Sequence, residues 1–413
     1  MNEIAGRMPL QVGSADAVAS SSQRAAAAVA PLTTRWVTDV DGWQALREIW
    51  DELLLASTDS TPWQSWDYLT NWWRHLGKGK ELRVLVVSRR EQPVMIFPLQ
   101  LTRELMIGIP TRMLEPISML WDVNRPRFAL GPFDEEAYRV GLRAISALPD
   151  WDCLRVEELP ISDPQAQAMR EFAEREGLWF RNVLSSICPH LSLEQTWAQF
   201  LQGRGSKLRK NLRAARRRLD ALGPVTFHVA TTVADIDRGL QTMLDLHRRS
   251  WKRRKRVGLS LSEPYRAFFR SFLLAMADRG AARVLTLRCG GQAVAATIAF
   301  THLDTYFSAE IVHDARYARC SPGTLLEAFE LEYLMNERRF RHYDFLGRFL
   351  NNKMRWTEQA RVTHRIYVFR PTARCWLLDL HYFRVKPWIK RYWRAVFGPS
   401  RATRQAMEFL QRS

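Results

Sequence analysis

A short pattern occurs twice in the chain, and this repeat limits the folds that the sequence can adopt. RVLVV at 83–87, followed by QPV at 92–94, returns 200 residues later as RVLTL at 283–287, followed by QAV at 292–294. Arg, Val, Leu, Gln and Val are identical in the two copies. Each copy reads as two β-rich runs around a polar turn, which is the pattern of a β-hairpin.

The segments around the hairpin recur in the same order. A helical pattern precedes each copy, at 65–76 and at 265–278, and WDCL at 151–154 resembles YDFL at 343–346 downstream. A repeated order of helix, hairpin, helix and strand predicts an α+β fold of two similar tandem domains, each a mixed twisted sheet flanked by helices.

We place the two predicted domains at 35–185 and 190–370. Ordered structure is expected to begin near Trp36, after a disordered, small-residue tail at 1–34 that lacks the basic start and apolar core of a secretion signal. The helical pattern at 41–54 is expected to form a single helix. Residues 371–413 are expected to form a basic, aromatic helical tail.

The charge of the chain indicates an anionic partner. It has 413 residues, with 61 Lys and Arg against 43 Asp and Glu, and a formal net charge of +18. Such a surface attracts nucleic acid, anionic lipid headgroups or a phosphate-rich cofactor. No apolar run approaches the length of a transmembrane helix. The five cysteines favour neither a disulfide framework nor a zinc site, and the nine histidines show no metal-ligand spacing, so we expect a cytoplasmic protein without a metal.

The tail leaves two interpretations open. Between 374 and 397 it alternates Trp, Tyr, Phe and Leu with Lys and Arg, which is the composition of a helix lying on an anionic membrane. Packing of this tail onto the second domain explains the same pattern. The first interpretation adds peripheral contact with the inner membrane to the expected location.

The segment Cys320-Ser321-Pro322-Gly323-Thr324 joins an expected strand at 305–312 to an expected helix at 324–339. Ser321 is expected to cap the helix, with Pro322 at its first position. Gly323 weakens a first turn unless a ligand must approach the backbone closely. A helix N-terminus that follows a strand binds phosphates, so we predict an anion site here, although a well-capped helix start is the simpler interpretation.

The first copy differs at the corresponding place. There the sequence is ALGPFDEEAY, with Asp134, Glu135 and Glu136 in the first turn. Carboxylates at this position repel a phosphate, so we expect the first domain to have no anion site.

Four stretches carry a resemblance to a known family: SKLRKNLRAARRRL at 206–219, LDLHRRSW at 244–251, DARYARCSPGTLL at 314–326 and DFLGRFLNNKMRW at 344–356. With them the chain resembles, over 36–370, the FemAB-like branch of the GNAT acyltransferase superfamily. That branch includes the CelD/BcsL-type acetyltransferases associated with cellulose or exopolysaccharide synthesis. The resemblance implies tandem GNAT domains, the first degenerate and on the substrate side, the second holding the acyl donor.

The resemblance also implies transfer of an acyl group to an amine. The donor in this branch is usually acyl-CoA, whereas the Fem peptidoglycan enzymes use aminoacyl-tRNA. The family motif usually has an aromatic residue just before the lysine that matches Lys353, and this chain has Asn352 there.

Four residues are candidates for the chemistry. Asp344 and Glu310 are the two candidate bases for the acceptor amine, and Asp344 equally suits a structural ion pair with a nearby arginine. Lys353 is a candidate for stabilising oxyanion or phosphate charge, or a surface residue. Tyr317 is a candidate acid for the departing thiolate, or a packing residue. Cys320 lacks a histidine partner and receives no role.

The candidate binding residues fall into two groups. Donor binding is assigned to Arg319 together with Ser321, Pro322, Gly323 and Thr324. His247 lies four residues before Trp251, on the same helical face, and suits either the core or the acceptor pocket. The candidate substrate-binding residues are His247, Trp251, Arg209, Lys210, Gly347, Arg348 and Trp356.

The sequence therefore predicts a CoA-dependent N-acyltransferase without a metal. Its acceptor is expected between the two domains, as an amine of an amino sugar, an amino acid or an envelope or exopolysaccharide precursor. A Fem-type aminoacyltransferase that uses charged tRNA is the alternative within enzymes. A nucleic-acid-binding protein without catalysis and a peripheral membrane scaffold are the alternatives from other classes.

Overall fold

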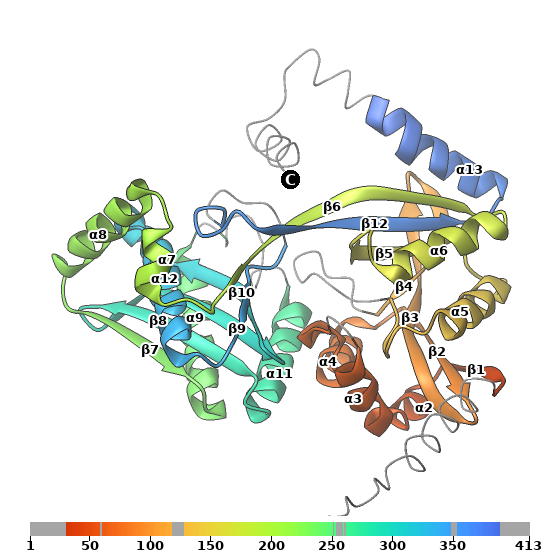
Figure 1. Ribbon diagram of the computed structural model, residues 1–413, viewed down its shortest axis with the longest axis horizontal. Coiled ribbons are helices and arrows are strands. Elements are labelled where there is room, and N and C mark those ends of the chain that lie inside the picture. Colours follow the sequence, from red (N-terminus) through yellow and green to blue (C-terminus); the bar gives the residue numbers. More distant parts are fainter. Residues whose placement is uncertain are drawn as a thin grey trace, which may run out of the picture.

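The computed structural model describes residues 30–57, 60–117, 128–250, 252, 259, 262–347 and 353–388. Its strands form one mixed, twelve-stranded sheet that runs through both halves of the chain (Figure 1). The strand order is β1-β2-β3-β4-β5-β12-β6-β11-β10-β9-β8-β7.

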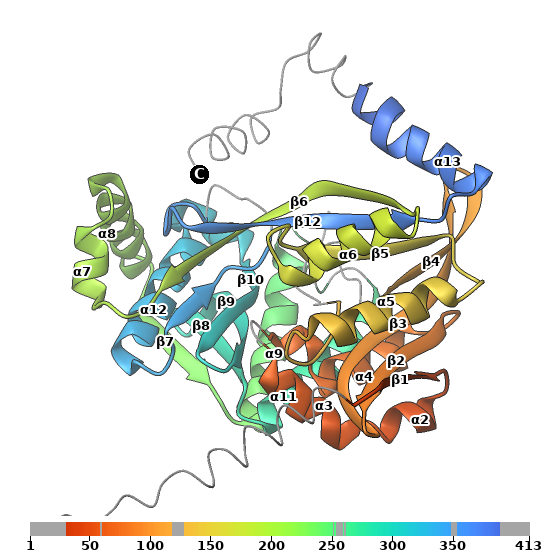
Figure 2. The same cartoon turned by 45° about the vertical axis from the view of Figure 1, so that its right-hand side comes forward.

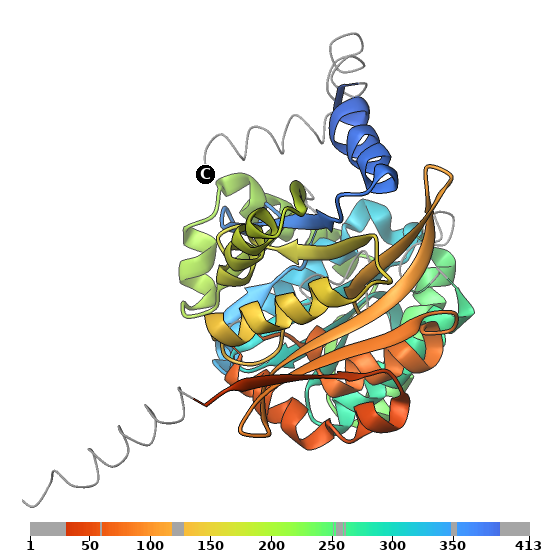
Figure 3. The same cartoon turned by 90° about the vertical axis from the view of Figure 1, so that its right-hand side faces the viewer.

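The first half contains six strands. Helices α5 and α6 pack against one face of its sheet (Figure 3), where Phe97, Tyr138 and Phe172 belong to one buried cluster. The elements are β1 (Leu32–Val37), α2 (Val40–Gln44), α3 (Arg47–Ala56), η1 (Pro62–Gln64), α4 (Trp66–Leu76), β2 (Glu81–Arg89), β3 (Gln92–Met106), β4 (Ile109–Pro116), α5 (Glu135–Ala147), β5 (Cys153–Leu159), α6 (Pro164–Arg175) and β6 (Trp179–Ser192).

The second half follows the same plan. Its elements are α7 (Trp197–Gln202), α8 (Ser206–Asp220), β7 (Val225–Ala230), α9 (Val233–Arg249), α11 (Glu263–Asp278), β8 (Ala282–Cys289), β9 (Gln292–His302), β10 (Thr305–His313), η3 (Ala315–Cys320), α12 (Pro322–Glu337), β11 (His342–Asp344), β12 (Ala360–Phe369), α13 (Ala373–Asp379) and η4 (Leu380–Val385).

The repeat seen in the sequence is present in the fold. The hairpin β2–β3 corresponds to β8–β9, and the register shifts at the same place in both, after Val87 in one copy and after Leu287 in the other. In each copy the next strand pairs in parallel with the strand after the following helix, β4 with β5 and β10 with β11. The predicted α+β fold with a mixed twisted sheet is confirmed.

Two long strands join the halves of the sheet. β12 lies between β5 and β6, while the last three residues of β6 pair with β11 (Figures 1 and 2). Ile366 and Val368 of β12 belong to the core of the first half, which accounts for the return of the chain to that side. The predicted boundary between 185 and 190 therefore falls inside β6, and the division into two domains stays a prediction.

The halves also share a hydrophobic core. The ring of Tyr68 on α4 lies 4.9 Å from that of Phe272 on α11, and the ring of Trp63 lies 5.2 Å from that of Phe300. These four aromatic side chains are almost completely buried. α4 and α11 occupy corresponding positions in the two copies of the repeat. Each half therefore covers the corresponding apolar helix face of the other half.

Several expected boundaries are corrected. Residues 32–34, expected in the disordered tail, belong to β1, which pairs with β2; residues 1–29 lie outside the described part. The expected helix at 41–54 is broken into α2 and α3 at Leu46. The helix expected at 324–339 spans Pro322–Glu337.

The C-terminal segment is helical as far as it is described. Cys375 and Leu378 of α13 are buried against the first half, and the helix continues through η4 to residue 388. Residues 389–413 lie outside the described part. No helix among the described residues combines the length and the apolar character needed to cross a membrane.

Candidate active site

Strands β10 and β11 separate and leave part of β10 without a neighbour from β11. They pair in parallel at three positions, which end at Phe307 and Asp344, whereas β10 continues to His313. A β-bulge at Ala309 interrupts the pairing of β10 with β9. Such bulges change the direction of nearby side chains and occur next to active sites.

The N-terminus of α12 lies beside this opening. A Cβ atom placed on Gly323 would come 3.5 Å from Nδ1 of His313 and 4.0 Å from Cδ1 of Ile311. These are ordinary contact distances, so the chain itself has room for a larger residue at 323. The need for glycine here is therefore not explained by packing within the chain.

The expected capping role of Ser321 is wrong. Ser321 has a left-handed backbone, with φ 49°, and its side chain caps none of the first N–H groups of α12. Pro322 does occupy the first turn, as predicted. Thr324 accepts a hydrogen bond from Arg355, which adds a guanidinium group to the helix start. This end of α12 therefore presents N–H groups that no described side chain caps.

The first copy fills the same position with its own carboxylates. Asp134 accepts a hydrogen bond of 3.0 Å from the N–H of Ala137, and Glu135 and Glu136 follow in the first turn of α5. Arg89 pairs with both Asp134 and Glu136. The three acids expected at the start of this helix are therefore in place, and the presence of an anion site at α12 alone stays a prediction.

Glu310 lies directly after the bulge, in a cluster of polar groups. Its carboxylate is 2.6 Å from Nζ of Lys252 and 3.0 Å from Nε2 of His247, which is 3% exposed. Burial favours the neutral acid, but Lys252 and the hydrogen bond with His247 outweigh it and lower the pKa of Glu310 to about 2. The structure thus brings together two predicted site residues, Glu310 and His247, and adds Lys252.

Asp344 and Lys353 are both held by the chain. Asp344 is 1% exposed, accepts a hydrogen bond of 2.7 Å from the N–H of Leu346 and pairs with Arg361 of β12. The ammonium of Lys353 donates to the carbonyl oxygens of Phe345, at 2.7 Å, and Gly347, at 2.8 Å. These contacts fix the segment after β11 and give both side chains an anchoring role.

The other predicted residues are more dispersed. Tyr317 donates a hydrogen bond to Gln292, and the carbonyl oxygen of Arg319 accepts one from Arg218 of α8. Arg209 binds carbonyl oxygens at the end of α7, whereas Lys210 is exposed. Trp356 is fully buried. Trp251 and Arg348 lie outside the described residues.

Two buried acids of α12 were missed by the sequence analysis. Glu327 accepts a hydrogen bond of 2.9 Å from the indole of Trp356. Glu330 accepts hydrogen bonds from Tyr306, at 2.8 Å, and Tyr343, at 2.9 Å, and its burial raises its pKa to about 8. The available signal was their spacing of three within an apolar stretch, which places both on one side of a helix.

A family model described as an acetyltransferase (GNAT) domain matches residues 206–358. No curated protein sequence shows significant similarity to the chain.

Solved structures share the fold at low sequence identity. FemX is 9% identical, over 81% of this chain and 96% of FemX, with a TM-score of 0.55. A conserved protein of unknown function from Bacteroides thetaiotaomicron VPI-5482 is 11% identical, over 82% of this chain and all of that chain, with a TM-score of 0.51. A tandem GNAT protein from the clavulanic acid biosynthesis pathway is 15% identical over 83% of this chain and all of that chain, with a TM-score of 0.46.

The matched residues contain the bulged strand β10, its opening toward β11 and the start of α12. The chain is therefore an acyltransferase that has a GNAT acetyltransferase domain at residues 206–358 and the FemX fold.

Proposed function

We propose that the chain is a CoA-dependent N-acyltransferase whose donor binds at the start of α12 and along the open edge of β10. The observation that carries this proposal is the difference between the two helix starts. α5 is capped by Asp134 and carries two further acids, whereas α12 has no side-chain cap and has Gly323 in its first turn. An exposed helix N-terminus attracts phosphate through its N–H groups and its dipole.

The residues at this end of α12 suit a pyrophosphate. The N–H groups of Gly323 and Thr324 precede that of Leu325, which already bonds to the carbonyl oxygen of Ser321. Arg355, held at Thr324, and Arg319, just before the helix, supply positive charge. When bound, acyl-CoA supplies the acyl group as an activated thioester. In this proposal a backbone N–H on the edge of β10 stabilises the oxyanion.

Glu310 and His247 are the groups that we assign to the acceptor amine. Glu310 stays ionised at neutral pH because its pKa is about 2, so it holds a cationic amine by charge and orients the His247 ring by their hydrogen bond. His247 is the proton acceptor in this arrangement. Asp344 is the second candidate, although Arg361 and the N–H of Leu346 already engage its carboxylate.

The acceptor class rests on the family resemblance. We propose an amine of an amino sugar, an amino acid or an envelope or exopolysaccharide precursor, as in the CelD/BcsL-type enzymes. In this proposal the first half binds the acceptor rather than the donor, because Asp134 caps the start of α5.

Calorimetric titration with acetyl-CoA and with a long-chain acyl-CoA tests the donor site. We expect binding that Gly323→Trp abolishes, because the indole fills the space in front of the first N–H groups. Gly205→Trp is the matched control, since a Cβ atom at Gly205 meets nothing within 4 Å. If neither thioester binds to the folded protein, or if Gly323→Trp binds as well as the parent, the donor site is wrong.

A Fem-type aminoacyltransferase is the second candidate. The observation that favours it is the exposed basic face of α8, where Lys207, Lys210 and Arg217 are all exposed. This candidate predicts binding of charged tRNA that weakens steeply with salt, together with indifference to CoA. Transfer assays with both donors under the same conditions separate the two functions.

The C-terminal helix supports peripheral contact with an anionic membrane as part of the proposal. Trp376 is 53% exposed and Trp388 is 67% exposed, with Arg384 and Lys386 near them in the sequence. Amphipathic aromatic side chains next to cations suit the headgroup region. Vesicles with phosphatidylglycerol are expected to bind the parent chain more strongly than a Trp376→Ser, Trp388→Ser variant; equal binding would remove this contact from the proposal.

A further inference from the structure

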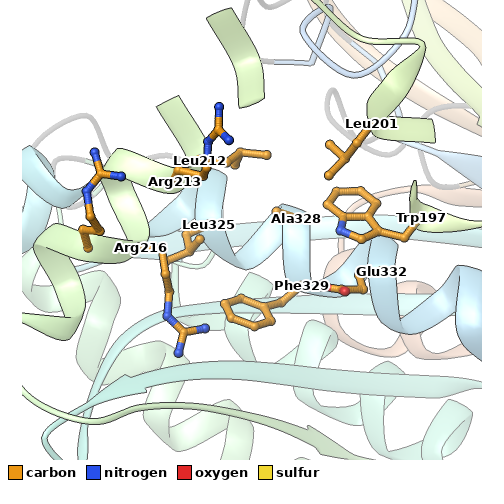
Figure 4. A pocket seen from close by; sticks show the side chains of 10 residues that line it. Trp197, Leu201, Leu212, Arg213, Arg216, Leu325, Ala328, Phe329 and Glu332 are labelled. Atoms are coloured by element: carbon orange, nitrogen blue, oxygen red, sulfur yellow. The ribbon is translucent and has the colours of Figure 1, made fainter. Parts of the chain in front are cut away.

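A groove of about 360 Å³ lies on the outer side of the second half, between α7, α8 and α12 (Figure 4). It starts at Leu325 on α12, so the residues assigned to the donor do not line it. Its volume lies within the range of small-molecule sites, about 300–1,000 Å³. The lining residues are Trp197, Leu201, Leu212, Arg213, Arg216, Arg217, Leu325, Ala328, Phe329 and Glu332.

The floor of the groove is mainly hydrocarbon. Leu212, Leu325, Ala328 and Phe329 supply aliphatic and aromatic surface from both helices. Trp197 closes one end and is fixed by stacking on Phe200, with ring centroids 5.5 Å apart. Such a floor offers few groups for hydrogen bonding and favours an apolar chain.

Positive charge gathers at the α8 end. In Figure 4 Arg213 and Arg216 come from α8 and face the side of the groove away from Trp197 and Glu332. Arg216 already lies over Phe329, 5.4 Å from its ring centroid, and pairs with Asp220. Arg213 and Arg217, one helical turn apart, form no ion pair with any described residue.

The opposite end disfavours an anion. Glu332 lies there, and its carboxylate, when ionised, repels a second negative charge; partial burial also raises its pKa. A ligand that fits is therefore charged at one end and apolar along its length, with the anion on α8.

We propose that this groove binds a monoacyl lipid phosphate, with its acyl chain on the floor between α8 and α12 and its phosphate on Arg213 and Arg217. Two guanidinium groups on one side of a helix match a dianionic phosphate, because each forms charge-assisted hydrogen bonds in a fork. The α8 cations that already bind groups of the chain, such as Arg209 and Arg218, face other partners. This site is independent of the proposed donor site.

Dodecyl phosphate below its micellar concentration is the probe, measured by calorimetry on the full chain. We expect saturable binding to one site per chain. Inorganic phosphate tests the contribution of the phosphate charge alone. Dodecyl maltoside tests the contribution of the dodecyl group alone, because its headgroup is neutral. Both are expected to bind at least tenfold more weakly than dodecyl phosphate, because each lacks either the alkyl chain or the phosphate.

Variants locate the site. Arg213→Gln with Arg217→Gln is expected to weaken dodecyl phosphate at least tenfold, whereas Lys207→Gln with Lys210→Gln, on the same helix but outside the groove, leaves it unchanged. Ala328→Trp fills the floor and is expected to abolish binding, and its circular dichroism and thermal unfolding show that the variant is folded.

Three results would overturn the site: no binding of dodecyl phosphate, equal binding by the Arg213→Gln, Arg217→Gln variant, or inorganic phosphate binding as tightly as dodecyl phosphate. None of these results bears on the donor site, because acetyl-CoA is measured separately.

Discussion

At the scale of single residues, two glutamates of the second half have opposite protonation states near neutral pH. Glu310 has cationic and hydrogen-bonding partners, so its pKa falls from the usual 4.5 to about 2. Its pairing therefore stabilises the fold above pH 4.5, and that stabilisation is lost as the pH falls toward 2. Among the described residues, Glu330 accepts hydrogen bonds from the hydroxyls of Tyr306 and Tyr343, so burial dominates and it stays protonated up to about pH 8.

Replacing Glu330 should change how stability depends on pH. Below pH 4.5 the folded and unfolded states both keep the proton. Between pH 4.5 and about 8 the unfolded state loses it first, so the free energy of unfolding falls as the pH rises. Glu330→Gln has no proton to lose, and its stability relative to the parent should rise by up to about 1.4 kcal/mol for each pH unit in this range.

Urea unfolding of both proteins at pH 5, 6.5 and 8 measures that difference. Glu337→Gln, on the same helix, is the matched control because its side chain is exposed. A difference between parent and Glu330→Gln that stays constant across the three pH values would contradict the buried neutral acid.

Glu310→Gln tests the proposed catalytic pair of Glu310 and His247. The amide no longer pairs with Lys252 and orients His247 poorly, so we expect kcat to fall by about 10²–10⁴-fold, the usual range for acid–base groups. Steady-state rates with acetyl-CoA and an accepted amine provide the measurement. Asp344→Asn is the comparison: if it lowers kcat while Glu310→Gln does not, and both variants remain folded, the assignment passes to Asp344.

At the scale of secondary structure, the sequence predicted individual helices and strands correctly where the signal lay within the element itself. The helical pattern at 65–76 corresponds to α4, with Ser65 as its N-cap, and the two runs of the first hairpin lie within β2 and β3. Ser321 failed as a cap because its left-handed backbone turns the side chain away from the N–H groups of α12, and periodicity carries no signal for that conformation. His247 and Lys252, the partners of Glu310, precede it by about 60 residues, and no local pattern in the sequence links them to it.

Helix α5 lies very close to strand β3, and a small residue makes this possible. A Cβ atom on Gly141 would come 2.3 Å from the ring of Phe97, which is fully buried. Gly141→Ala should therefore destabilise the fold by about 1–3 kcal/mol through overpacking, despite the better helix propensity of alanine. Thermal unfolding measures the loss.

Gly323→Ala is the matched control for that substitution. Its Cβ atom meets neighbours at 3.5 Å or more, so stability should be unchanged or slightly higher. If Gly141→Ala proves as stable as Gly323→Ala, α5 and β3 are less tightly packed than the structure shows.

At the scale of the whole molecule, the repeat in the sequence predicted two similar halves but not how they are joined. The pairing of β12 with β5 links residues about 200 positions apart, and no local pattern in Ala360–Phe369 identifies β5 as the neighbouring strand. The aromatic core between α4 and α11 could not be predicted from the sequence either. The pattern of each helix indicates one apolar face but not the element that covers it.

A chain that ends at residue 359 should lose the fold of both halves. Without β12, β5 and β6 lose a shared neighbour, and Ile366 and Val368 no longer fill the first core. We expect a single calorimetric transition for the full chain and none for the shortened one. Two separate transitions in the full chain, or a folded shortened chain, would show that the halves are independent.

The position of β12 also sets the order of events during synthesis on the ribosome. β5 is made early, but the strand that covers its open edge follows only after about 200 more residues, a wait of roughly 10–40 s at typical rates of translation. Until then the nascent first half exposes a strand edge that can pair with another chain. The growing polypeptide is thus a natural client for chaperones, and its yield should depend on the speed of translation.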